Sequence, residues 1–211
     1  SWYLYSIQNQ NETNIPVGEY KLIMNQYDAD GAIFRPTVYE VLVDRALMFF
    51  NNYAEYGVST PLSFQVDDVR YFADASSFSK IKLNDKDTTS VQYKVLRLYQ
   101  TILKEEIRSK NRFALADYDL KRLEYIYGQS TLDNKTELYA EALRTLAAAN
   151  KDISYHTDIV SVLANFVIAN KQGKEPKVEA LKMCNDAIKL HPDSKGAIKC
   201  RQIIQEIERP E

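Results

Sequence analysis

The chain has 211 residues, of which 45% are hydrophobic and 27% charged, and its 27 basic and 29 acidic residues leave a net charge of -2. This composition is typical of a soluble globular domain and disfavours both a disordered chain and a membrane span. Lys and Arg do not cluster, so charge does not indicate binding to nucleic acid or to an anionic membrane. Only 6 Gly and 6 Pro are present, which favours long helices joined by few loops.

The first part of the chain is predicted to hold two helices and a long connection. Apolar residues at helical spacing predict one helix over 16–27 and a second over 36–53, with Phe49 and Phe50 in the core. Over 54–87 the pattern breaks up, which indicates a long loop with short helical turns. We expect four aromatic side chains to pack this loop down: Phe64, Tyr71, Phe72 and Phe78.

From Thr88 onward the periodicity predicts six helices of similar length. Their start signals are Thr88, Thr89 or Ser90, then Phe113, Asp133 or Asn134, Ser154, Pro176 and Ser194. We expect Gly128 to end the second of them as a left-handed C-cap, and Gly173 to end the fourth. Short polar turns between them make consecutive helices antiparallel neighbours.

A repeat signal lies near the C-terminus. Ala180, Cys184 and Ala187, followed by Pro192, match the second helix of a tetratricopeptide repeat, in which small residues let a neighbouring helix approach closely. The first-helix half of that motif is degenerate. The sequence therefore predicts an all-α fold of stacked antiparallel helical hairpins, tetratricopeptide-like, with one long packed loop region.

The predicted organisation is a single helical domain over 1–211. Residues 1–87 supply the N-terminal helices and the long connection, and residues 88–211 supply a six-helix tetratricopeptide-like stack.

One segment resembles a calcium loop. Four residues follow the order of an EF-hand: Asp28, Asp30, Gly31 and Ile33. Gln26 and Thr37, however, occupy the first and last ligand positions, where the loop needs carboxylates. We interpret the segment as a turn that ends a helix, and we expect no metal site there.

The remaining metal-ligating residue types are sparse. His156 and His191 lie at the ends of predicted helices with no His or Cys at ligand spacing, so the pattern does not predict zinc. Cys184 and Cys200 lie in apolar helical patterns and are interpreted as small buried hydrophobic residues, with a disulfide between neighbouring helices as the alternative.

No catalytic constellation is predicted. Ser77 and Lys80 match the Ser-x-x-Lys pair of penicillin-recognising enzymes, but the companion Ser-Asp-Asn and Lys-Thr-Gly tripeptides are missing from the sequence. Carboxylate pairs are interpreted as solvated helix faces or caps: Asp67 with Asp68, Glu105 with Glu106, and Asp117 with Asp119. A hydrolase that uses such carboxylates remains the weakest hypothesis. The chain is therefore predicted to be no enzyme, with no catalytic, cofactor-binding or metal-binding residue.

Two further patterns concern the surface. The pairs Asp119 with Arg122 and Glu137 with Arg144 are predicted to be surface ion pairs of small energetic value. The 15 tyrosines are interpreted mainly as packing residues, and the alternative is a peptide-binding groove; examples are Tyr93, Tyr99 and Tyr139.

The segment 34–50 resembles a region near the N-terminus of alpha-2-macroglobulin-like proteins of Bacteroidetes bacteria. An Arg-Pro-Thr-hydrophobe-Tyr opening begins at Arg35, and an Arg-Ala-Leu-x-Phe-Phe close begins at Arg45. The similarity extends through Leu98-Tyr99-Gln100, the helices around 117–123 and 138–143, and the end from Cys200 to Pro210.

The resemblance implies a helical, non-catalytic scaffold or interaction module of a bacterial protease inhibitor. It implies an extracytoplasmic location, periplasmic or anchored to the outer membrane, and partners that are downstream macroglobulin β-sandwich domains or another envelope protein. Neither cysteine stands in the Cys-x-Glu-Gln setting of the family thioester, so no functional residue carries over. The alternative function is a peptide- or glycan-binding tetratricopeptide-like domain of the cell surface.

Overall fold

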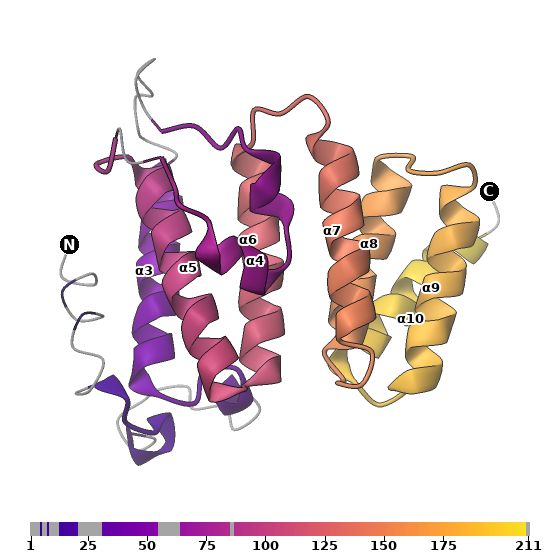
Figure 1. Cartoon of the computed structure of the whole chain (residues 1–211). Helices are drawn as coiled ribbons and strands as arrows, with labels where there is room; N and C mark the ends of the chain where they lie inside the picture. Colours follow the sequence, from indigo (N-terminus) through magenta and orange to yellow (C-terminus); the bar gives the residue numbers. More distant parts are fainter. Residues whose placement is uncertain are drawn as a thin grey trace. The chain divides into compact units, whose positions relative to one another are not determined.

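The structure is a computed structural model that describes Tyr5, Gln8 and residues 13–20, 31–54, 64–84 and 87–209. Every regular element in these ranges is a helix, which confirms the all-α prediction (Figure 1). The elements are η1 (Val17–Tyr20), η2 (Gly31–Ile33), α3 (Val38–Ala54), η3 (Val69–Phe72), α4 (Ala75–Lys80), α5 (Val91–Ser109), α6 (Arg112–Gln129), α7 (Lys135–Ala149), α8 (His156–Ala169), α9 (Pro176–Leu190) and α10 (Lys195–Glu208). None of these helices combines the length and the apolar character needed to cross a membrane.

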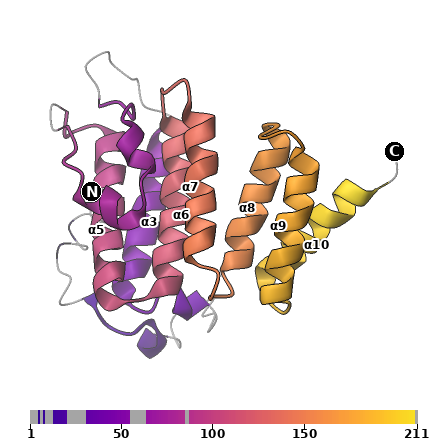
Figure 2. The same ribbon diagram turned by 45° about the vertical axis from the view of Figure 1, so that its right-hand side comes forward.

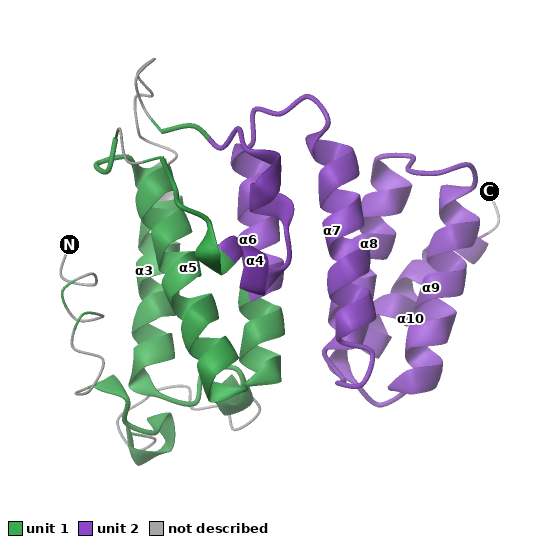
Figure 3. Ribbon diagram, viewed as in Figure 1, with its two compact units in different colours: residues 1–65, 79–118 green, residues 66–78, 119–211 purple. Residues whose placement is uncertain are grey.

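The chain forms two compact units that interleave along the sequence (Figure 3). Unit 1 consists of Ser1–Gln65 and Ser79–Tyr118, and unit 2 of Val66–Phe78 and Asp119–Glu211. Within unit 1, α3 packs against α5. Within unit 2, α7 packs against both η3 and α8, and the three helices α8, α9 and α10 all contact one another.

Local sequence signals place most helix starts as expected. The hydroxyl of Ser90 caps α5 by accepting from the backbone N–H of Tyr93, and Ser194 caps α10 by accepting from Ala197. Pro176 occupies the first position of α9, where its missing N–H costs no hydrogen bond.

The predicted helix ends are less accurate. Gly128 is no left-handed cap, because the N–H of Ser130 bonds to the carbonyl of Ile126 at 2.8 Å and α6 continues past the glycine. Two other ends are left-handed: Lys110 follows α5 at φ 61°, and Gly173, as predicted, adopts this conformation after α8 at φ 81°.

Within the helix predicted over 16–27, the described residues 17–20 form the 3-10 turn η1. Its start is held by the chain leading into α3, because Val17 donates to the carbonyl of Pro36 at 2.8 Å and Val38 donates to Ile15 at 3.0 Å. Residues 21–30, including Asp28 and Asp30, lie outside the described residues.

The helix predicted over 36–53 is α3, and its aromatic end is only half buried. Phe50 is 6% exposed, whereas Phe49 is 36% exposed, because consecutive helical residues point about 100° apart. The four aromatic residues expected to pack the long connection are all buried: Phe64, Tyr71, Phe72 and Phe78.

Helices α8, α9 and α10 pack against one another (Figure 2). Small residues of these helices are buried in their contacts. Ala180, Cys184 and Ala187 are fully buried on α9, as the repeat pattern predicts, and Cys184 and Cys200 are free thiols. At Gly196, a β-carbon would fall 2.3 Å from the backbone nitrogen of Asp158. The first turn of α10 therefore approaches the start of α8 more closely than any side chain permits.

Candidate functional site

A polar pocket of about 400 Å³ lies in unit 1, beside the first turn of α3 and the last turn of α5. It is lined by Asn14, Pro36, Thr37, Glu40, Glu105, Arg108, Ser109 and Asn111. The pocket therefore offers hydroxyl, amide, carboxylate and guanidinium groups from segments that are far apart in the sequence.

The α3 side of the pocket is fixed by the helix start. The carboxylate of Glu40 accepts from the backbone N–H of Thr37 at 2.8 Å and also from its hydroxyl. This is the return half of a capping box, in which the third residue of the first turn satisfies the N–H of the cap. Glu40 is thus held in place by its own helix.

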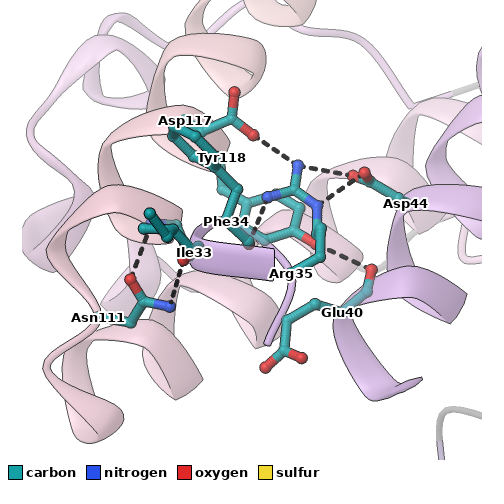
Figure 4. A network of polar contacts seen from close by, with 9 residues as sticks. Ile33, Phe34, Arg35, Glu40, Asp44, Asn111, Asp117 and Tyr118 are labelled. Carbon is teal, nitrogen blue, oxygen red and sulfur yellow. Dashed lines mark hydrogen bonds and ion pairs between the residues drawn. The ribbon is translucent and has the colours of Figure 1, made fainter. Parts of the chain in front are cut away.

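The segment that leads into α3 is anchored by Arg35 (Figure 4). Its guanidinium donates to both carboxylate oxygens of Asp44, at 2.7 and 3.0 Å, and to Asp117 at 2.5 Å. It also donates to the carbonyl of Phe34 at 2.7 Å and lies 4.0 Å from the ring centroid of Tyr118. Burial opposes the charge, but Tyr118, Asp44 and Asp117 outweigh it and raise the pKa of Arg35.

Two further contacts join the same segment to residues at the start of α6. Asn111 donates to the carbonyl of Ile33 at 3.1 Å, and Phe34 packs edge-on against Phe113 at 5.8 Å. Arg35 and its partners therefore serve as a structural clamp, and the predicted solvated role of Asp117 is wrong, because its carboxylate is buried against the guanidinium.

A buried carboxyl group lies next to the pocket wall. Glu106 is 1% exposed; its Oε2 accepts from the Ser109 hydroxyl at 3.2 Å, while its Oε1 has no hydrogen-bond partner among the described residues. Burial, with a further contribution from the charge of Glu40, raises the pKa of Glu106 to about 7. The interpretation of this residue as part of a solvated face is therefore wrong.

The open side of the pocket carries an internal ion pair. Arg108 donates to the two oxygens of Glu105 at 2.6 and 3.0 Å, and the arginine is largely exposed. The Ser109 hydroxyl is occupied by the carbonyl and carboxylate of Glu106, both at 3.2 Å. Such a lining can hydrogen-bond a polar ligand.

Unit 2 has a buried arginine of its own. Arg122 is 0% exposed and bonds to Asp119 at 2.7 Å, so the prediction of a surface ion pair is wrong. Its other donors bond to the carbonyls of Tyr71 and Ala73, and the guanidinium lies 4.4 Å from the ring centroid of Phe78. The spacing of the pair was visible in the sequence, but its burial depends on a segment about 50 residues earlier.

The structure reassigns several other candidates. Asp74 caps α4, because its carboxylate accepts from the backbone N–H of Ser77 at 3.0 Å and from the Ser77 hydroxyl at 2.7 Å, so Ser77 has a structural role. Arg144 pairs with Glu179 at 3.0 Å instead of the predicted Glu137. Tyr139 is buried and stacks on Tyr127 with ring centroids 4.7 Å apart, in agreement with a packing role.

Within the described part of the chain, no three or more His, Cys, Asp or Glu side chains are grouped so that they could hold a metal ion. There is one pair that sequence spacing could not suggest, since His156 and His191 lie beside each other in unit 2, with ring centroids 6.3 Å apart.

Comparison with protein-family models, with curated proteins and with solved structures gives no match to this chain.

Proposed function

We propose that this chain is a non-catalytic helical interaction module that scaffolds a bacterial alpha-2-macroglobulin-like protease inhibitor. The observation that carries the proposal is the α8–α9–α10 stack, whose buried small residues match the tetratricopeptide pattern. Stacks of this kind present helix faces as extended surfaces for other proteins.

The side chains exposed on this stack suit protein contact. Val178 on α9 and Ile198 on α10 are 58% and 57% exposed, and Leu190 at the end of α9 is also exposed. Exposed apolar side chains gain free energy when a partner removes them from water.

The choice of a non-catalytic role is supported by the pocket in unit 1. Both carboxylates on its wall are engaged internally, Glu40 with Thr37 and Glu105 with Arg108. Glu106, whose pKa is raised, is sealed from solvent and does not line the pocket. A hydrolase would need an accessible carboxylate poised to exchange a proton with a substrate.

The family, the partner and the location rest on the sequence resemblance of 34–50. In the proposal, the module packs against macroglobulin β-sandwich domains outside the cytoplasm, in the periplasm or at the outer membrane. The contacts of Arg35 support the family proposal in one respect. They give the arginine of the Arg-Pro-Thr segment a structural role, which proteins of one fold would have in common.

The test is a binding measurement between this chain and purified macroglobulin-type β-sandwich domains. We expect binding that the variants Val178→Asp and Ile198→Asp weaken at least about tenfold, since each places an unpaired charge in a buried contact. Met48→Asp is the matched control, because Met48 is as exposed as these residues but belongs to unit 1. Absence of binding, or equal weakening by all three variants, contradicts the proposal.

A second candidate function is peptide or glycan binding, which the pocket in unit 1 favours. Its test is a thermal-shift screen of peptides and glycans against the chain and against Arg108→Ala. A ligand that raises the melting temperature of the parent chain but not that of the variant supports this function. If no ligand raises the melting temperature of the parent chain, the function is rejected.

A further inference from the structure

The fold brings together the chain's two histidines, which are 35 positions apart in the sequence. His156 is the first residue of α8, and His191 follows the last residue of α9. Their ring centroids are 6.3 Å apart and their planes are inclined at 65°. Both residues belong to unit 2, so the unit itself determines their separation.

Backbone carbonyl groups define which nitrogen of each neutral ring carries the proton. Nδ1 of His156 lies 3.0 Å from the carbonyl oxygen of Ala147, and Nε2 of His191 lies 2.8 Å from that of Lys151. A carbonyl oxygen only accepts hydrogen bonds, so each of these nitrogens must be the donor. The lone pairs of the neutral rings are therefore at Nε2 of His156 and Nδ1 of His191.

This arrangement is the one that metal-binding histidines use. In metal sites, the nitrogen opposite the ligating one commonly donates to a carbonyl or carboxylate group, which fixes the ring and its tautomer. Within the described residues, Nε2 of His156 and Nδ1 of His191 have no hydrogen-bond partner. Neither nitrogen is among the side-chain atoms that are buried without a partner. Both lone pairs are thus available to a ligand from solvent.

We propose that His156 and His191 form a two-imidazole site for monovalent copper. Imidazole is a good ligand for copper, and Cu(I) accepts two nitrogen ligands in a near-linear arrangement. With a metal–nitrogen bond of about 2.0 Å, a linear complex separates the two ring centroids by about 6.4 Å, and a tetrahedral angle reduces this to about 5.2 Å. The observed 6.3 Å matches the linear value, which applies when the two free nitrogens face each other across the ion.

The local charge also favours a monovalent ion. His156 is buried, and the positive charge of Lys151 acts on its ring. The ammonium of Lys151 repels any bound cation, and the repulsion of a singly charged ion is half that of a doubly charged one.

The first test is a Cu(I) titration of the whole chain, without oxygen, in competition with a chromophoric bicinchoninate chelator. We expect one ion per chain, and at least about tenfold weaker binding for His156→Gln and for His191→Gln. Glutamine keeps an N–H donor for the backbone carbonyl, and thermal unfolding of each variant verifies the fold. Unchanged affinity in either variant would assign the ion to other groups, such as Cys184 and Cys200, and would overturn the proposal.

The second test reads the two rings directly by long-range ¹H–¹⁵N NMR. Because the chain has 2 histidines, the two variants assign both spectra. We expect the Nδ1–H tautomer at His156 and the Nε2–H tautomer at His191 before copper is added. Cu(I) should then shift the ¹⁵N signals of the two opposite nitrogens; the reverse tautomers, or a shift at one ring alone, would contradict the site.

Discussion

The hydroxyl of Tyr118 donates to the backbone carbonyl of Glu40 across 3.0 Å, which ties α6 to the first turn of α3. The same ring supports the guanidinium of Arg35, and Tyr118 is fully buried. Replacing Tyr118 with Phe keeps the ring and removes the hydrogen bond. We expect a loss of about 1 kcal/mol in the free energy of unfolding, measured by urea denaturation. A neutral effect would mean that the bond contributes nothing to the clamp.

Arg35→Lys tests the clamp more severely. Lysine cannot reproduce the forked contact with Asp44 while also reaching Asp117, so the buried carboxylate of Asp117 and the half-buried one of Asp44 lose contacts with a guanidinium. We expect a loss of about 2–4 kcal/mol in the free energy of unfolding. The control is Arg70→Lys, which alters the exposed pair with Asp68 and should leave the denaturation midpoint unchanged.

Gly196→Ala is expected to loosen the contact between α8 and α10. The new methyl group would lie 2.3 Å from the backbone nitrogen of Asp158 and 2.4 Å from Oγ1 of Thr157, so a helix must move. Overpacking of this kind costs about 1–3 kcal/mol of unfolding free energy. The matched variant is Gly128→Ala, which meets no atom within 4 Å inside α6 and should gain about 0.5–1 kcal/mol. Equal effects of both variants would contradict the close approach.

The buried carboxyl of Glu106 predicts a pH dependence of stability. Its pKa is raised from 4.5 to about 7 in the folded chain, so between these values the folded state binds more protons than the unfolded state. The contribution of Glu106 to stability is therefore fully present below pH 4.5 and is lost as the pH rises through 7, by roughly 3 kcal/mol in total.

Glu106→Gln isolates this contribution, because the amide has no charge to bury. We expect the variant to match the parent near pH 4 and to exceed its unfolding free energy at pH 8. The difference between the two chains, followed by denaturation at several pH values, should grow through the range 4.5 to 7. A difference that is constant with pH would show that Glu106 does not hold its proton.

Short-range signals in the sequence were sufficient for the helices. Ser90, Pro176 and Ser194 mark their helices because a cap or a first-turn proline acts within four residues of itself. The prediction of a left-handed cap at Gly128 was wrong, because a glycine permits a left-handed conformation but does not require one. Phe49 and Phe50 could not be distinguished, because both lie near the edge of a wide apolar face.

The candidate site could not be predicted from such short-range signals. Arg35 finds Asp117 82 positions later, and the pocket takes its walls from segments that adjoin only after folding. The spacing of Asp119 and Arg122 predicts that they form an ion pair. It does not predict that the pair is buried, because the segment that covers it lies elsewhere in the chain. The two histidines, likewise, become neighbours only through the packing of unit 2.

The position of Arg122 in unit 2 also constrains the order of assembly during synthesis. The carbonyls of Tyr71 and Ala73 emerge from the ribosome 51 and 49 residues before the arginine that binds them. These two hydrogen bonds can therefore form only after all of 79–118 has been translated. A nascent chain halted before α6 lacks the donors for both carbonyls, and synthesis of the helix supplies them.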